Sequence, residues 1–331
     1  MSARLLVNVL RRPETVTACG STEWNGLVAA ARAERLLATL AHRLECADVP
    51  RGVRAVMADA VIDAQREQRI ALWEADRARE ALHPLGIPVI LLKGAAYVAA
   101  GLKAGEGRMI GDLDILVPRD RLEEAEALLL AEGWEWVKSD PYDSAYYRRW
   151  MHELPPLIHR ERDRMIDVHH TILPLTARVT PDAPALIANS VEIAIGLRVL
   201  SPEDRVCHAL AHMLADGDLT GGLRNLWDIR CLLADVRDNA ALEKRALLHG
   251  LAPHLARARR LAEHLFADGN TQLTLPDRLY VRRLLSRDTW GRERHPITRF
   301  AFYIRSHLLR MPPGLLLRHL WTKWRKGHRP S

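Results

Sequence analysis

"GRMIGDLDILV", residues 107–117, places two aspartates one residue apart in an otherwise apolar run. A buried carboxylate costs several kcal/mol unless it is paired or bound to a metal ion. If residues 112–117 form a β-strand, Asp112 and Asp114 point to one side of it and the apolar residues between them point to the other. Two carboxylates so close repel each other, and a divalent cation between them removes the repulsion. The stretch therefore predicts a metal-binding strand. The alternative is a strand end whose acids are solvated or paired with Arg or Lys.

The sequence around this run predicts a mixed sheet. Its expected strands are short, rich in β-branched residues and bounded by glycine or proline. They cover residues 87–94, 112–117, 134–137, 154–160, 164–172 and 191–199. The last is expected to be a single strand with one buried face, because its apolar residues alternate strictly with the others.

Helical patterns fill most of the remaining chain. Residues 22–84 and the chain from Ser201 onward are rich in Ala, Leu, Arg and Glu. Ser201 is expected to cap a helix that has Pro202 in its first turn. A helix after the aspartate strand is expected to begin at Asp120 and to end before Gly133.

The predicted fold class is α+β, with a small mixed sheet, flanking helices and a helical C-terminal lobe. A chain of 331 residues exceeds what one hydrophobic core usually serves. The expected parts are a helical segment (1–84), the mixed core (85–200) and a helical domain (201–331).

Composition limits the classes of function. The net charge of +7 permits a phosphate-bearing partner without requiring one. Four scattered cysteines without a CxxC pair favour neither a zinc knuckle nor a disulfide framework. The N-terminal "LLVNVL" is too short for a signal-peptide core, and no apolar run reaches the roughly 18 residues of a membrane span. We therefore expect a cytoplasmic protein.

Residues before and within the loop 103–108 are of the types that bind phosphate groups. Lys93 and Gly94 end the first strand, and a glycine ahead of a helix lets backbone N–H groups approach a phosphate closely. Arg108 lies four residues before Asp112, in a loop whose glycines would let it fold over a triphosphate. These positions favour the interpretation of residues 112–117 as a metal-binding strand, because Mg²⁺ commonly binds carboxylates together with substrate phosphates.

The order strand, "KG", helix, loop with "GR" and then "GDLDILV" resembles the DNA polymerase beta-like nucleotidyltransferase superfamily. Within it, the chain is most similar to the bacterial group called uncharacterised nucleotidyltransferases. The later "MIDVHH" (165–170) fits that group's pattern of a strand with one acid and one histidine. The resemblance covers roughly residues 85–232, because "LSPEDRVCHALAHML" and "LRNLWDIRCLL" are similar to the group's helical continuation.

The resemblance implies a nucleotidyltransferase-type sheet and a catalytic metal site. It makes Asp167 the third acid beside Asp112 and Asp114, with Mg²⁺, or else Mn²⁺, as the cofactor. All three acids are then expected to be both catalytic residues and metal ligands. The implied reaction moves a nucleoside monophosphate from a nucleoside triphosphate such as ATP to an acceptor.

Four further residues are expected to bind the triphosphate: Lys93, Gly94, Arg108 and His169. Asp167 and His169 share one face of their strand, so one of the adjacent histidines, His169 or His170, would hydrogen-bond the acid or a phosphate. A purely structural histidine is the equal alternative.

The acceptor is a hydroxyl or phosphate of a sugar, peptide or small molecule, with nucleic acid less favoured. The alternative function is a non-catalytic nucleotide- or RNA-binding module on the same scaffold. The three acids discriminate between the two, because a degenerate scaffold has no reason to keep their electrostatic cost.

Two pairs with helical i, i+4 spacing leave alternatives open. His208 and His212 have zinc-ligand spacing, but they could also face the cleft or be structural. Arg224 and Asp228 are read first as a helix-surface ion pair, with a place in the interlobe cleft as the alternative.

The segment 294–331 holds nine Lys or Arg and no acid. We read it as a solvated basic helix that packs on the helical lobe through its leucines. The alternative is a patch for nucleic acid or an anionic membrane.

Overall fold

The computed structural model describes residues 2–138, 140–267, 269, 271–314, 316 and 321. In this part of the chain seven strands form one mixed sheet in the order β3-β4-β5-β2-β1-β7-β6. The strands are β1 (Val89–Leu91), β2 (Leu113–Leu116), β3 (Trp134–Trp136), β4 (Leu157–His159), β5 (Met165–His169), β6 (Val191–Ala194) and β7 (Leu197–Val199). The predicted α+β class is confirmed.

Parallel and antiparallel pairs are combined in this sheet. At its centre β2 pairs antiparallel with β1 and parallel with β5. The strand β7 lies parallel to β1, and the remaining neighbours pair antiparallel. All residues of β1 and β2 are buried, which explains why both read as continuous apolar runs in the sequence.

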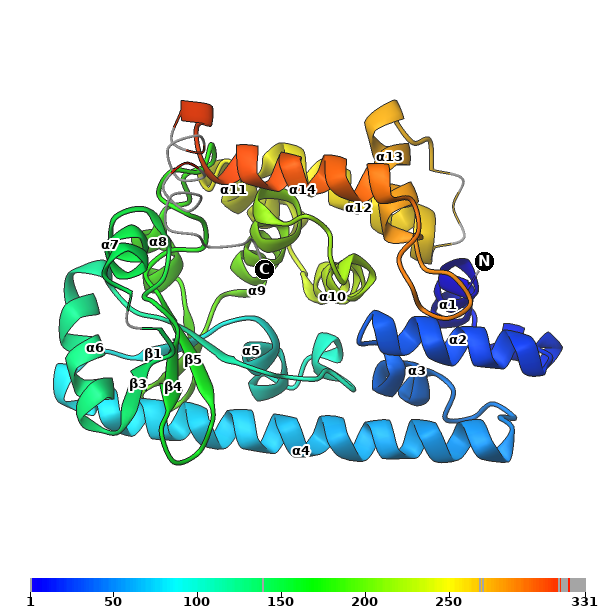
Figure 1. Ribbon diagram of the computed structural model, residues 1–331, viewed down its shortest axis with the longest axis horizontal. Coiled ribbons are helices and arrows are strands. Elements are labelled where there is room, and N and C mark those ends of the chain that lie inside the picture. Colours follow the sequence, from blue (N-terminus) through cyan, green and yellow to red (C-terminus); the bar gives the residue numbers. More distant parts are fainter. Residues whose placement is uncertain are drawn as a thin grey trace.

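Four helices precede the sheet: α1 (Ser2–Arg11), α2 (Ser21–Ala33), α3 (Leu37–Arg43) and α4 (Arg51–Leu82). The long α4 runs beneath the sheet and the N-terminal helices in Figure 1, and it contacts β1 and β2. Buried alanines at helical spacing, Ala71, Ala75 and Ala78, let the helix approach its neighbours closely. The turn between β4 and β5 is tied to α4 by Arg162, whose Nε lies 2.8 Å from the Glu74 carboxylate.

Helices within the sheet region position its loops. They are α5 (Lys93–Ala99), α6 (Leu122–Ala131), α7 (Pro141–Trp150) and α8 (Ala183–Ala188). The helix α6 ends before Gly133, as predicted, but it does not begin at Asp120. A short 3₁₀ turn, Arg119–Arg121, precedes α6, and no side chain caps that helix.

The predicted strand 191–199 is a hairpin of β6 and β7 instead. Gly196 has a φ of +73°, which glycine adopts without strain, and it turns the chain between the strands. Ile195 is 87% exposed at this turn. The alternation predicted a buried face because periodicity alone does not register a turn within an apolar pattern.

The C-terminal part is helical, as predicted. Its helices are α9 (Pro202–Leu210), α10 (Gly222–Asp235), α11 (Asn239–Leu248), α12 (Ala252–Phe266), α13 (Leu275–Leu284) and α14 (Pro296–Arg310), with a π-helical turn, Ala211–Asp216, directly after α9. The predicted cap is confirmed, because the Ser201 side chain accepts a hydrogen bond from the Asp204 backbone. No helix in the described part of the chain combines the length and apolar character that a bilayer crossing needs.

The basic helix α14 packs on the π-helical turn. Its buried residues are Phe302 and Ser306, and Arg305 donates to the backbone oxygen of Leu214 at 2.5 Å. Packing on the helical lobe is therefore confirmed for the described residues, but it does not rest on leucines. Residues 322–326, which carry most of the alternative patch for nucleic acid or an anionic membrane, lie outside the described residues.

Candidate active site

The two strands that carry the predicted acids are neighbours in the sheet. The parallel register of β2 and β5 places Asp114 opposite Asp167. His169 follows two residues later and faces the same side. One ligand atom from each of these three residues lies within 4.8 Å of the others. The expectation that Asp114 and Asp167 meet is confirmed, although they are far apart in the chain.

Asp114 is buried, with 3% of its surface exposed. Its Oδ1 accepts from Lys93 Nζ at 2.5 Å and from His169 Nε2 at 3.0 Å. Burial alone would raise the pKa of Asp114, but the charges and hydrogen bonds of Lys93 and His169 hold the pKa well below its usual range. Asp114 is thus a buried carboxylate whose charged form is stabilised by two hydrogen-bond donors.

Lys93 reaches this carboxylate from the junction of β1 and α5. Burial lowers the pKa of Lys93, but the adjacent Asp114 charge outweighs it, and the net pKa lies above its usual range. The backbone of Lys93 has a φ of +46°. A left-handed conformation costs a non-glycine residue about 1–2 kcal/mol. Such strain persists only where surrounding contacts fix it, and it is concentrated at functional sites.

Among the described residues no Lys or Arg pairs with Asp167 in the way that Lys93 pairs with Asp114. Burial, followed by the charges of Glu153 and Asp114, raises the pKa of Asp167 to about 7. Its Oδ1 is buried and has no hydrogen-bond partner among the described residues. A buried oxygen without a partner beside a second carboxylate suits a hard divalent cation, which oxygen ligands bind best. The residues present therefore fit a Mg²⁺ or Mn²⁺ ion.

Asp112 lies at the edge of this group. It is exposed, directly precedes β2, and does not belong to the set of ligand atoms within 4.8 Å. Its negative charge nevertheless contributes to the raised pKa of Lys93, where Asp114 contributes more. It also contributes to the raised pKa of Asp167, where burial, Glu153 and Asp114 contribute more. The structure thus brings Asp114 and Asp167 together and leaves Asp112 at the solvent side.

Two further members of the cluster were missed in the sequence. His152 and Glu153 precede β4, and Glu153 forms an isolated β-bridge with His169. Glu153 Oε2 lies 3.5 Å from Nε2 of both His152 and His169. The available signal was a "HE" pair directly before an expected strand. Sequence spacing does not say which way an irregular segment turns its side chains.

Gly94 lies in close contact with the Arg108 side chain. A Cβ atom at position 94 would lie 2.7 Å from Arg108 Nε and 3.2 Å from Ile110 Cγ1. The Arg108 guanidinium forms a salt bridge with Asp228 and lies over the Tyr97 ring, 5.5 Å from its centroid. Arg108 is therefore held by protein partners close to the start of α5, and its contact with a phosphate stays a prediction.

The reading of Arg224 and Asp228 as a surface pair is wrong. Only 4% of Arg224 and 3% of Asp228 is exposed. Arg224 Nη2 lies 2.7 Å from Asp228 Oδ1, and Arg224 Nη1 donates to Thr39 Oγ1 at 2.6 Å. Helical i, i+4 spacing pairs the two residues correctly but does not tell which face of α10 is covered.

The paired histidines of the helical part face the site. His208 is buried and His212 is exposed on the π-helical turn. Both line a small pocket together with Lys93, Tyr97, Arg108 and Asp228. No candidate metal cluster among the described residues includes either histidine.

His170, the other predicted candidate, makes a structural contact. One of its ring nitrogens, Nε2, lies 3.2 Å from the Met151 backbone oxygen. His169 is therefore the histidine that contacts the acids, and its partner is Asp114 rather than Asp167.

Gly94→Ala tests the packing of Arg108. The new methyl group has to displace Arg108, which weakens the buried Arg108–Asp228 pair, so we expect a loss of about 1–3 kcal/mol in the free energy of unfolding. Gly52→Ala is the matched control, since nothing lies within 4 Å of a Cβ there. Gly52 is, like Gly94, the second residue of its helix, so alanine is expected to leave the free energy of unfolding unchanged or slightly higher. Urea unfolding measures both changes, and a Gly94→Ala protein as stable as wild type would contradict the tight contact.

A family model described as "Uncharacterised nucleotidyltransferase" matches residues 20–267. The match contains every site residue named above and runs from α2 to the end of α12. It therefore extends beyond both ends of the segment on which the sequence resemblance rests. No curated protein matches the chain.

Proposed function

The chain belongs to this family of uncharacterised nucleotidyltransferases, and on that premise we propose that it catalyses metal-dependent transfer of a nucleoside monophosphate from a nucleoside triphosphate. The acceptor is a hydroxyl or phosphate group of a sugar, peptide or other small molecule. ATP is the first triphosphate to test. A cytoplasmic location, where ATP and Mg²⁺ are abundant, agrees with this activity.

One observation supports the proposal most strongly. Asp114 and Asp167 are aligned on adjacent parallel strands, and the buried Oδ1 of Asp167 lacks a hydrogen-bond partner among the described residues. A non-catalytic scaffold gains nothing from this arrangement, since the acids destabilise each other. Asp114, Asp167 and Asp112 would hold Mg²⁺ or Mn²⁺, which would neutralise triphosphate charge and favour attack at the α-phosphate.

The protein's own groups have distinct roles in this proposal. Lys93 supplies positive charge beside Asp114 and would contact the triphosphate. Asp167 faces the acceptor and would accept the proton from its hydroxyl. His169 donates to Asp114 and fixes the orientation of that carboxylate. Gly94 would let the backbone approach the phosphates.

The position of the label distinguishes nucleotidyl transfer from phosphoryl transfer. The protein is incubated with cell extract, Mg²⁺ and ATP labelled at either the α- or the γ-phosphate. We expect an acceptor labelled from the α-position and pyrophosphate labelled from the γ-position. An acceptor labelled only from the γ-position would contradict the proposal, and parallel incubations with the other triphosphates test the choice of nucleotide.

Arg108→Ala is expected to weaken ATP binding more than AMP binding, because its proposed target is the charge of the terminal phosphates. The variant also removes one of the two arginines that pair with Asp228, so its stability has to be measured alongside. Calorimetric titration with a non-hydrolysable ATP analogue and with AMP gives both affinities. Equal losses for the two nucleotides would remove Arg108 from this role.

A further inference from the structure

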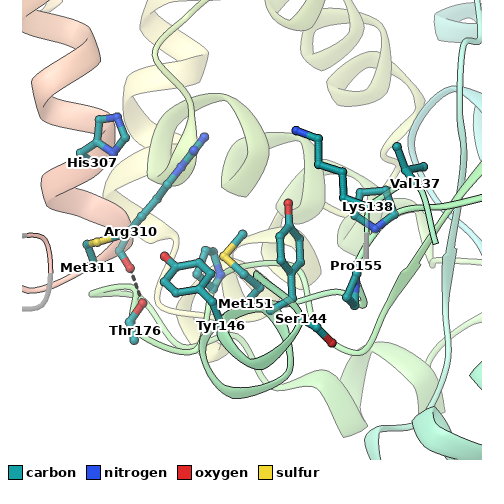
Figure 2. Close-up of a pocket in the computed structure, with 13 residues that line it drawn as sticks. Val137, Lys138, Ser144, Tyr146, Met151, Pro155, Thr176, His307, Arg310 and Met311 are labelled. Carbon is teal, nitrogen blue, oxygen red and sulfur yellow. Dashed lines mark hydrogen bonds between the residues drawn. The ribbon is translucent and has the colours of Figure 1, made fainter. Parts of the chain in front are cut away.

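A cavity of about 420 Å³ is lined in part by Met151 and Pro155 (Figure 2), which flank the cluster members His152 and Glu153 in the chain. One side of it is formed by α7 and by the segment between α7 and β4, and the other by the end of α14.

A third segment, which follows β5, also lines the cavity with Pro174 and Thr176. It is joined to the end of α14 by hydrogen bonds: Thr176 Oγ1 donates to the Arg310 backbone oxygen at 2.6 Å, and the Arg178 backbone donates to the Leu309 oxygen at 3.3 Å. The cavity thus lies between the sheet region and the helical part, where hydrogen bonds hold the two together.

The order of the strands places this cavity at one end of the site. Lys93 follows β1, Asp114 lies in β2 and Asp167 in β5, so the sheet aligns the three in that order. Glu153 extends the row beyond Asp167, because its segment pairs with β5. Met151 and Pro155 line the cavity from this same segment. The cavity therefore adjoins the Asp167 end of the row, opposite the end where Lys93 would contact the triphosphate.

The lining combines positive charge with flat apolar surface. Lys138 and Arg310 contribute cations, and none of the described lining residues is acidic. Arg310 Nε pairs with Asp216 Oδ1 at 2.5 Å, on the π-helical turn that also carries His212. In Figure 2 Lys138 and Arg310 lie on opposite sides of the cavity, and both side chains extend toward the top of the view. Tyrosine, proline and methionine side chains supply most of the remaining wall.

We propose that this cavity binds the acceptor, and that the acceptor carries an anionic group, a carboxylate or a phosphate, on a ring-shaped or apolar body. The cations would bind the anionic group, and the aromatic and proline faces would pack on the body. An acceptor held there presents its reacting oxygen from the Asp167 side. This inference rests on the proposed nucleotidyl transfer, whose acceptor it describes.

Three small probes test the pocket: phenyl phosphate, benzoate and the uncharged phenol. Ligand-observed NMR titration of the full chain should show at least one anionic probe binding about tenfold or more tightly than phenol, a difference of about 1.4 kcal/mol. The stronger of the two anions identifies phosphate or carboxylate as the preferred group. Lys138→Glu should weaken binding of the anionic probe about tenfold or more. Lys244→Glu reverses the charge of an exposed lysine on α11 that does not line the cavity, and it should leave binding of the anionic probe unchanged.

Competition assigns the pocket to the acceptor. A non-hydrolysable ATP analogue with Mg²⁺ should bind together with the anionic probe, and Lys138→Glu should retain binding of that analogue. Displacement of the probe by the nucleotide would overturn the assignment, because the cavity would then be part of the nucleotide site. Anionic probes that bind no better than phenol, or equal losses in the two lysine variants, would also overturn it. If the probe binds through Lys138 but no triphosphate binds, an anion pocket stands and the nucleotidyl function fails.

Discussion

Asp167→Asn is expected to lower nucleotidyl transfer by about a thousandfold, within the range that removal of a general base produces. Its affinity for ATP with Mg²⁺ should stay within about tenfold of wild type. The amide has the shape of the carboxylate, but it cannot accept a proton from the acceptor. Asp167 also lies toward the acceptor side of the row that begins at Lys93 and Asp114, so its loss should affect the chemical step more than nucleotide binding.

We also predict the effect of Asp167→Asn on the free energy of unfolding. Glu153 and Asp114 both disfavour the charged form of Asp167, so in EDTA the Asp167→Asn protein should be at least as stable as wild type. Asp163→Asn is the matched control, because Asp163 is an exposed acid in the turn that leads into β5. It should leave transfer unchanged. Transfer by Asp167→Asn within tenfold of wild type would contradict the role of this residue.

Asp114→Asn is expected to abolish Mg²⁺-dependent triphosphate binding and also to destabilise the fold. Lys93 and His169 both donate to Asp114 Oδ1, and removal of one partner of a buried pair leaves the other charge uncompensated. We expect a loss of about 2–4 kcal/mol in the free energy of unfolding, somewhat below the range for fully buried pairs, because a quarter of the Lys93 side chain is exposed.

A second substitution tests the cause of the lost stability in Asp114→Asn, and triphosphate binding is then judged from the single variant, because Lys93 is itself a proposed triphosphate contact. Lys93→Met in the same chain removes the uncompensated ammonium, so the double variant should regain much of the lost stability in urea unfolding. Wild-type triphosphate binding by the single variant would show that Asp114 is not a metal ligand.

The sequence allowed the central strands to be predicted because both are short apolar runs closed by glycine or proline. The apolar run 87–94 and the aspartate strand 112–117 contain β1 and β2, and the acid–histidine strand 164–172 contains β5. The order of these strands in the sheet could not be predicted from the same patterns. Local patterns do not encode which strands become neighbours, and it was the family resemblance that implied Asp167 beside Asp114. The parallel register of β2 and β5 then confirmed it.

Two of the errors share a physical origin, since they concern contacts between distant segments. Glu153 enters the cluster through a bridge to His169, and its own segment has no regular periodicity. Arg224 and Asp228 are buried because Thr39, from an N-terminal helix, and Arg108, from the loop before β2, cover that face of α10. The hairpin at Gly196 was missed because two short strands and one long strand give nearly the same alternation.

The central claim is that Asp114 and Asp167 hold the catalytic cation. Anomalous diffraction from crystals soaked with Mn²⁺ and a non-hydrolysable ATP analogue tests it directly. The account predicts a manganese peak about 2.0–2.3 Å from one carboxylate oxygen of each of these two residues, in contact with the triphosphate. The competing group among the described residues is His152, Glu153 and His169. A peak at that group with Asp114 and Asp167 outside its ligand shell, or no peak near either aspartate, would contradict the account.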